Sequence, residues 1–469
     1  MTVAGQEAVN YSYDSNSRLT QILTDLSVIA SGAKQSLSFA FNYDELGRRI
    51  STILPNGVTT NYSYDNASHL LELKHLNPLN QILESLNYVY DANGNRTKMD
   101  RQNVSVKLPN AVTNTTYNQA NQMLTFNDKS ITYDANGNMT SVTNACGITN
   151  YTWDVRNRLA GISGFNTDCA PLTASFKYDA LGRRIEKTIN SKTINYLYDG
   201  LDIVQEIENG TVTVNYVRTL NIDEPLARIK TDGTIRFYQQ DALGSVIALT
   251  DETGVIKTQY SYDPFGAVII TGEASDNPFQ FAGRENDGTG LLFERNRYLS
   301  FELQRYISQD PIGFAGGDVN FYSRVGNNPV NFVDPLGLFS INVGLEGFVG
   351  AFGFGGTGGI YGAYVHDPSQ PWYKGWSAYT VVTYGGGGAG TVRGAGGGLY
   401  IGGSNASNIC DLKGLSGYGG RVGSKLITLS GYANSGGLKG GGITIGPSYG
   451  YTAGFGGATN TKILWGGSF

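Results

Sequence analysis

Cysteine, histidine and excess basic charge are scarce in this chain of 469 residues. The three cysteines, Cys146, Cys169 and Cys410, form no Cys-x-x-Cys unit, and we expect neither a disulfide framework nor a zinc site from them. The three histidines lack the spacing of metal ligands, so no metal or other cofactor is expected. The net charge of −5 provides no global basic field that would favour nucleic acid as a partner.

A signal peptide and long apolar runs are also missing. Residues 1–10 contain neither a basic n-region nor an apolar h-region. No segment has 18 consecutive apolar residues, and the nearest candidate, residues 347–365, is too rich in glycine for a membrane helix. If the protein is exported, we expect a route that does not read such a signal.

Tyrosine is abundant, with 30 residues against 4 tryptophans, and it recurs in a Tyr-Asp repeat. Most neighbouring copies lie 16 to 30 residues apart, which is the spacing of a repeat architecture. The copies are Tyr13-Asp14, Tyr43-Asp44, Tyr64-Asp65, Tyr90-Asp91, Tyr133-Asp134, Trp153-Asp154, Tyr178-Asp179, Tyr198-Asp199 and Tyr262-Asp263, with degenerate copies at Tyr117 and Tyr238.

Each copy has the residues of a β-hairpin. The aromatic alternation predicts a strand, the aspartate caps the turn that follows, and Asn-Gly or Leu-Gly supplies a residue that tolerates positive φ. A single hairpin is only marginally stable, so the copies are expected to stack or to join one continuous sheet. The Tyr-Asp pairs are therefore assigned to structure and none of them to catalysis.

The repeat resembles that of the Rhs/YD-repeat family, from about residue 11 to residue 338. From residue 238 the segments YQQDALGS, NPFQFAGREN, RYISQDPIGF and NFVDPLGL resemble, in order, the Rhs repeat-associated core. The resemblance implies an all-β fold of stacked hairpins that form a spiralling sheet or partial shell. It divides the chain into a repeat array at 1–237, the core at 238–338 and a variable C-terminal domain at 339–469.

The core contains two Asp-Pro-x-Gly units, at Asp310 and Asp334. From the residues alone the better interpretation is a pair of structural turns, because Asp caps, Pro fixes φ and Gly accepts positive φ. The resemblance implies instead that Asp310 and Asp334 form an aspartic-type autopeptidase that cuts the bond Leu338–Phe339. Two carboxylates near one peptide bond cannot both ionise cheaply, so one acts as a base on water and the other as an acid.

The resemblance also assigns a supporting arginine, which maps to Arg297 of the segment RNRYL. Its implied role is to hold one carboxylate ionised and in place. The family usually continues Arg-Tyr-Tyr-Asp-Pro, whereas this chain reads Arg-Tyr-Leu-Ser-Phe from Arg297, so the neighbouring Arg295 stays open as the alternative.

The composition changes after Leu338. Residues 339–469 contain 39 of the 64 glycines, with seven basic residues against three acidic ones. Apolar and aromatic residues interleave the glycines, which predicts a Gly-rich antiparallel β domain. No catalytic cluster is evident there; the alternation of apolar residues with Gly, Ser and Thr would suit a membrane as a partner.

Together these features indicate a component of an Rhs-type polymorphic toxin used in bacterial competition. The shell would enclose or present its own C-terminal domain as cargo and release it by self-cleavage. The implied partners are a cognate immunity protein and an N-terminal shell or delivery partner. The implied location is cytoplasmic before export, then secreted or at the cell surface. Two alternatives stay open: a structural or adhesive surface repeat protein without cleavage, and an inactive remnant with a non-toxic tail.

Overall fold

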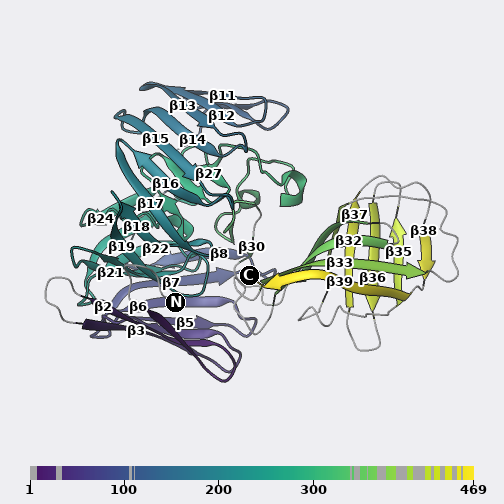
Figure 1. The fold of residues 1–469 in the computed structure, drawn as a ribbon, viewed down its shortest axis with the longest axis horizontal. Helices are drawn as coiled ribbons and strands as arrows, with labels where there is room; N and C mark the ends of the chain where they lie inside the picture. Colours follow the sequence, from purple (N-terminus) through teal and green to yellow (C-terminus); the bar gives the residue numbers. More distant parts are fainter. Residues whose placement is uncertain are drawn as a thin grey trace. The chain divides into compact units, whose positions relative to one another are not determined.

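The computed structural model describes residues 8–27, 34–104, 108–109 and 111–338, and beyond them the backbone of ten strands (Figure 1). Nearly all regular structure in these residues is β, with three short 3₁₀ turns: η1 (Phe281–Gly283), η2 (Gly313–Gly316) and η3 (Val325–Asn327). The chain forms two compact units, residues 1–14 with 19–344, and residues 15–18 with 345–469. No helix in the described residues has the length and hydropathy of a transmembrane helix. The predicted all-β fold is confirmed.

In the first unit the hairpins stack in chain order, and all strand pairs are antiparallel (Figure 1). An eight-stranded sheet comprises β1 (Val9–Tyr13), β2 (Leu19–Ser27), β3 (Lys34–Tyr43), β4 (Arg49–Ile53), β5 (Thr59–Tyr64), β6 (Leu70–Leu76), β7 (Ile82–Tyr90) and β8 (Arg96–Arg101).

A sheet of sixteen strands follows, again in chain order. Its strands are β9 (Thr115–Tyr117), β10 (Met123–Phe126), β11 (Lys129–Tyr133), β12 (Met139–Asn144), β13 (Gly147–Trp153), β14 (Leu159–Phe165), β15 (Pro171–Tyr178), β16 (Arg184–Ile189), β17 (Lys192–Asp199), β18 (Asp202–Glu208), β19 (Thr211–Arg218), β20 (Pro225–Lys230), β21 (Ile235–Gln240), β22 (Val246–Thr250), β23 (Ile256–Tyr262) and β24 (Val268–Gly272). The sheet therefore runs without interruption across residue 237.

Two small sheets complete the first unit. One contains β25 (Glu285–Asn286), β26 (Leu291–Glu294), β27 (Arg297–Ser300) and β28 (Arg305–Tyr306). The other pairs β29 (Phe332–Val333) with β30 (Ile341–Asn342), so that the chain on either side of residues 334–340 is held together. The segment 291–307 packs Leu291, Phe293, Tyr298 and Ile307 into one apolar core with β10–β16 of the long sheet.

Many turns of the array share one geometry, which we call the repeat turn. In it the aspartate Oδ1 accepts the backbone N–H groups of the second and fourth residues that follow. At Asp179 these donors are Leu181 and Arg183, each at 2.9 Å. The glycine between them, Gly182, has φ +87°, a conformation that glycine adopts without strain. The same bonds recur at Asp65, Asp91, Asp134, Asp154, Asp241, Asp251 and Asp263.

The repeat aromatics tie each hairpin to the previous one. The hydroxyl of Tyr64 donates to the carbonyl of Arg49 at 2.9 Å, and Tyr178 donates to Leu159 at 2.7 Å. Where the repeat has tryptophan, the indole of Trp153 makes the equivalent bond, to Met139 at 2.8 Å. These contacts give the Tyr-Asp pairs the structural role that the sequence predicted.

The cysteine prediction was wrong in one respect, because Cys146 and Cys169 form a disulfide. Cys146 lies in the turn between β12 and β13, and Cys169 lies in the turn between β14 and β15. Alternate turns of a meander lie at the same edge of the sheet, so a separation of 23 residues, close to the repeat length, brings the two cysteines together. No Cys-x-x-Cys unit is needed for this pairing.

The second unit is a nine-stranded antiparallel sheet, as predicted for a Gly-rich β domain. Its order is β38-β35-β36-β37-β34-β31-β32-β33-β39. The bounds are β31 (Val349–Gly355), β32 (Gly358–His366), β33 (Trp376–Gly386), β34 (Leu399–Ser404), β35 (Tyr418–Gly423), β36 (Ile427–Ala433), β37 (Lys439–Ile445), β38 (Thr452–Phe455) and β39 (Ala458–Ser468).

Candidate active site

Asp310 and Asp334 each lie in a turn that shares part of the repeat-turn geometry. Asp310 Oδ1 accepts the N–H of Ile312 at 2.9 Å, and Asp334 Oδ1 accepts the N–H of Leu338 at 2.9 Å. The backbone shape predicted from the residues alone, a Pro-Gly turn, is therefore present at both positions. The difference lies in the second carboxylate oxygen, Oδ2. At Asp44, Asp154 and Asp179 of the array this oxygen pairs with an arginine of its own turn, at 2.7 Å in each case.

In the core, the Oδ2 atoms of both aspartates face one shared arginine, Arg297. Its Nη1 lies 3.2 Å from Asp310 Oδ2, and its Nη2 lies 3.0 Å from Asp334 Oδ2. All three side chains are withdrawn from solvent, with exposed fractions of 3% for Arg297, 7% for Asp310 and 1% for Asp334. A planar guanidinium with a fixed fork of donors suits this double contact. The geometry thus fixes two carboxylates on either side of one cation.

A second shared contact orients Asp334. The hydroxyl of Tyr306 lies within hydrogen-bond distance of two carboxylates, Glu294 and, at 3.0 Å, Asp334 Oδ2, and its one proton is shared between them. Burial and the neighbouring Asp334 raise the pKa of Tyr306 well above its ordinary value, so its hydroxyl stays protonated and can donate. Arg324 closes the group by pairing with Glu294 at 2.8 Å.

The charges of this group do not balance. Three carboxylates, Asp310, Asp334 and Glu294, face two guanidinium groups, Arg297 and Arg324. Burial raises the pKa of Asp334; Glu294 raises it further, whereas Arg297 lowers it. Burial also raises the pKa of Asp310, with Asp334 adding to the rise and Arg297 opposing it. One carboxyl group therefore keeps its proton to a higher pH than an isolated aspartate would.

A polar cavity of about 90 Å³ opens beside the pair. It is lined by Arg297, Asp310, Asp334 and Leu338, together with residues of the segment 316–326. A polar cavity of this size is large enough to admit water. Gly316 forms part of its wall, since a Cβ at that position would lie 2.6 Å from Asp310 Oδ2 and 3.0 Å from the Leu338 carbonyl oxygen. A water molecule in this cavity would therefore lie close to Asp310, to Asp334 and to the Leu338 carbonyl.

The structure brings together Arg297, Asp310, Asp334 and Leu338, four of the predicted site residues. Phe339, the other side of the predicted cleavage site, lies outside the described residues. The alternative, Arg295, forms its ion pairs with Asp202 and Asp223 of the array.

Sequence reasoning missed three members of the site. They are Glu294, which directly precedes the RNRYL segment, Tyr306, four residues before Asp310, and Arg324, which lies between the two Asp-Pro units. Their closeness to the predicted motifs was the only available signal, because their contacts are tertiary.

One known family model covers both the array and the core. The Teneurin YD-shell family model matches residues 27–330. The tRNA nuclease WapA of Bacillus subtilis (strain 168) is 31% identical over 67% of this chain and 15% of its own length. The double-stranded DNA deaminase toxin A of Burkholderia cenocepacia (strain H111) is 30% identical over 64% of this chain and 22% of its own length.

A solved structure shares the fold. The Photorhabdus luminescens Tc holotoxin pore matches with a TM-score of 0.54 and 19% identity, over 71% of this chain and 20% of that chain. At this identity the likeness concerns the fold alone. This chain spans less than a quarter of the length of each of these proteins.

Proposed function

Because this chain belongs to the Rhs/YD-repeat family, we propose that it is the part of a toxin that cuts its own chain after Leu338 and so releases the C-terminal segment as an effector. One observation carries this proposal. Arg297 holds Asp310 and Asp334 on either side of its guanidinium, while Asp334 also binds the N–H of Leu338. A pair of structural turns would need neither the shared arginine nor the burial of both carboxylates.

The reaction we propose is hydrolysis of the Leu338–Phe339 peptide bond. Asp334 accepts hydrogen bonds from Leu338, Arg297 and Tyr306, and these donors favour its ionised form. Asp310, beside the Leu338 carbonyl, is then the member that holds the proton.

In the first step the ionised carboxylate takes a proton from water as the water oxygen bonds to the Leu338 carbonyl carbon. The protonated carboxyl polarises the carbonyl oxygen. In the second step the C–N bond breaks and a proton passes to the departing amine of Phe339. Because the substrate belongs to the same chain, its effective concentration is high and one turnover needs only a modest catalyst.

Release of an effector is supported by the relatives. One relative is named a tRNA nuclease and another a double-stranded DNA deaminase toxin, and both names fit a chain that carries an effector. We assign the effector role to residues 339–469, with a cognate immunity protein and a delivery partner. The Cys146–Cys169 disulfide supports export, because disulfides persist in oxidising compartments.

The proposal is tested with the purified full chain and Asp334→Asn. Mass spectrometry of the wild type should show two fragments, residues 1–338 and 339–469, whereas the variant should remain one chain. A wild-type chain that is folded and uncut would refute self-cleavage. Growth of cells that express each form, with and without a candidate immunity protein, then tests the effector role: the wild type should be toxic and be rescued.

A further inference from the structure

The tip of the β26–β27 hairpin holds the segment that leads to the proposed cut. Three consecutive residues of the tip donate side-chain hydrogen bonds to three consecutive backbone carbonyls, in the same order along both segments. The pairs are Arg295 with Pro335, Asn296 with Leu336 at 2.9 Å, and Arg297 with Gly337 at 2.5 Å.

These three hydrogen bonds act on the main chain of residues 335–337. A Cβ at Gly337 would lie 2.1 Å from the carbonyl oxygen of Glu294 and 3.1 Å from the backbone nitrogen of Arg297, so the two backbones touch. Gly337 also has φ +67°, which only glycine adopts readily. The segment is therefore aligned by its carbonyl groups, and the next residue along it is Leu338.

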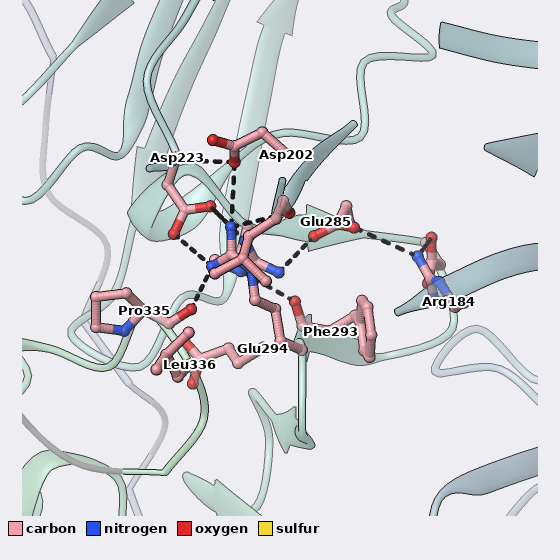
Figure 2. Close-up of polar contacts among 12 residues, drawn as sticks. Arg184, Asp202, Asp223, Glu285, Phe293, Glu294, Pro335 and Leu336 are labelled. Atoms are coloured by element: carbon pink, nitrogen blue, oxygen red, sulfur yellow. Dashed lines mark hydrogen bonds and ion pairs between the residues drawn. The ribbon is translucent and has the colours of Figure 1, made fainter. Parts of the chain in front are cut away.

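Arg295 is in turn held by the repeat array. Its Nη1 lies 2.9 Å from Asp223 Oδ2, and its Nη2 lies 2.8 Å from Asp223 Oδ1 and 3.1 Å from Asp202 Oδ1. Asp202 begins β18, and Asp223 lies between β19 and β20. Figure 2 shows these two aspartates on one side of the cluster and Pro335 and Leu336 on the other.

The choice of residue at the tip supports a role for this side chain. Arg295 has φ 55°, in the left-handed region where hairpin turns favour Gly or Asn. Arginine gains nothing from this backbone conformation. Its guanidinium, however, joins the array to the Pro335 carbonyl, which a glycine could not do.

We propose that Arg295 and Asn296 are positioning residues for self-cleavage. Arg295, fixed by Asp202 and Asp223, makes the alignment of the cleaved segment depend on folded strands β18–β20. The inference rests on the proposed cleavage after Leu338. It predicts that the chain is cut only once this part of the array has formed around the core.

The experiment compares rates of self-cleavage after the full chain is refolded from denaturant. Arg295→Met should cleave about 10²-fold more slowly, the loss expected when a reacting group is misplaced by about 1 Å. Asn296→Ala, at an exposed position where misfolding is not expected, should be about 3- to 10-fold slower. Asp223→Asn should slow cleavage, and its effect and that of Arg295→Met should be less than additive, because the two side chains contact each other.

Arg101→Met is the matched control, because Arg101 is a buried arginine of β8 that pairs with Glu84 in the eight-stranded sheet, outside β18–β20. It should lower the melting temperature about as much as Arg295→Met and leave the cleavage rate unchanged. In the positioning variants the shape of the pH profile should also be that of the wild type.

Wild-type rates in both Arg295→Met and Asn296→Ala would overturn the inference while leaving self-cleavage intact. An equal slowing by Arg101→Met would also overturn it. An uncut wild type would instead refute the proposed function itself.

Discussion

Asp334 Oδ1 accepts the backbone N–H of Leu338 at 2.9 Å, the same bond that Asp179 makes to Arg183 in the array. The proposed catalytic turn thus shares this bond with the repeat turns, but its second carboxylate oxygen, Oδ2, pairs with Arg297 in place of an arginine of its own turn. In this account a turn of this kind becomes reactive through burial of its carboxylate and the change of partner to Arg297.

Asp334→Asn should abolish cleavage. The asparagine keeps an oxygen that accepts the Leu338 N–H, so the turn should survive, but the carboxylate is lost and the rate should fall about 10²- to 10⁴-fold. The time course of fragment formation on denaturing gels measures the rate. Asp179→Asn, in an equivalent array turn, is the control and should cleave at the wild-type rate; wild-type cleavage by Asp334→Asn would remove this residue from the mechanism.

Cleavage should be fastest at mildly acidic pH. Burial raises the pKa of Asp310 and of Asp334, so the last proton of the pair leaves above the usual carboxyl range. As pH rises through that raised pKa the acid is lost and the rate falls; at lower pH both groups are protonated and the base is lost. Refolding into buffers of different pH, with circular dichroism to confirm folding, measures the profile. A rate that climbs steadily to alkaline pH would contradict the shared proton.

Gly316→Ala should slow cleavage without unfolding the chain. The added methyl group would press on Asp310 Oδ2 and the Leu338 carbonyl oxygen, and we expect a rate loss of about 10²-fold. Gly182→Ala, in an array turn away from the cavity, is the control. Its Cβ would meet nothing within 4 Å but its φ is +87°, so it should cost about 1 kcal/mol of stability and leave the rate largely unchanged. Equal rates for the two variants would mean that the cavity is not the site of water attack.

Loss of the disulfide should destabilise the array near the disulfide and leave self-cleavage unchanged. A disulfide between residues 23 positions apart stabilises the fold by about 3 kcal/mol, because it lowers the conformational entropy of the unfolded chain. In Cys146→Ser, backbone amides of β12–β15 should exchange hydrogen faster, while those of β20–β23 should not. Mass-resolved hydrogen exchange measures this. If cleavage stopped in this variant, the chemistry of the core would depend on the stability of the array near the disulfide, which would contradict this account.

The repeat turns could be predicted from sequence because they are local: aspartate and glycine set the turn whatever surrounds them. Asp310 and Asp334 were found in the same way, by motif. Glu294 and Arg324 were not found from the sequence, because their ion pair depends on how four segments pack against one another.

The Cys146–Cys169 bond was missed for a related reason. It is long-range in sequence but follows from the repeat length, which places alternate turns together. Only the period of the array, applied to the cysteines, could have revealed it.

The most direct test of self-cleavage is to refold the chain in water enriched in oxygen-18 and to determine the mass and terminal sequences of the products. The account predicts a body that ends at Leu338 with one oxygen-18 atom in its new carboxyl group, and a second fragment that begins FSINVGLEGF. A folded chain that stays intact, or a cut at another bond, would contradict it.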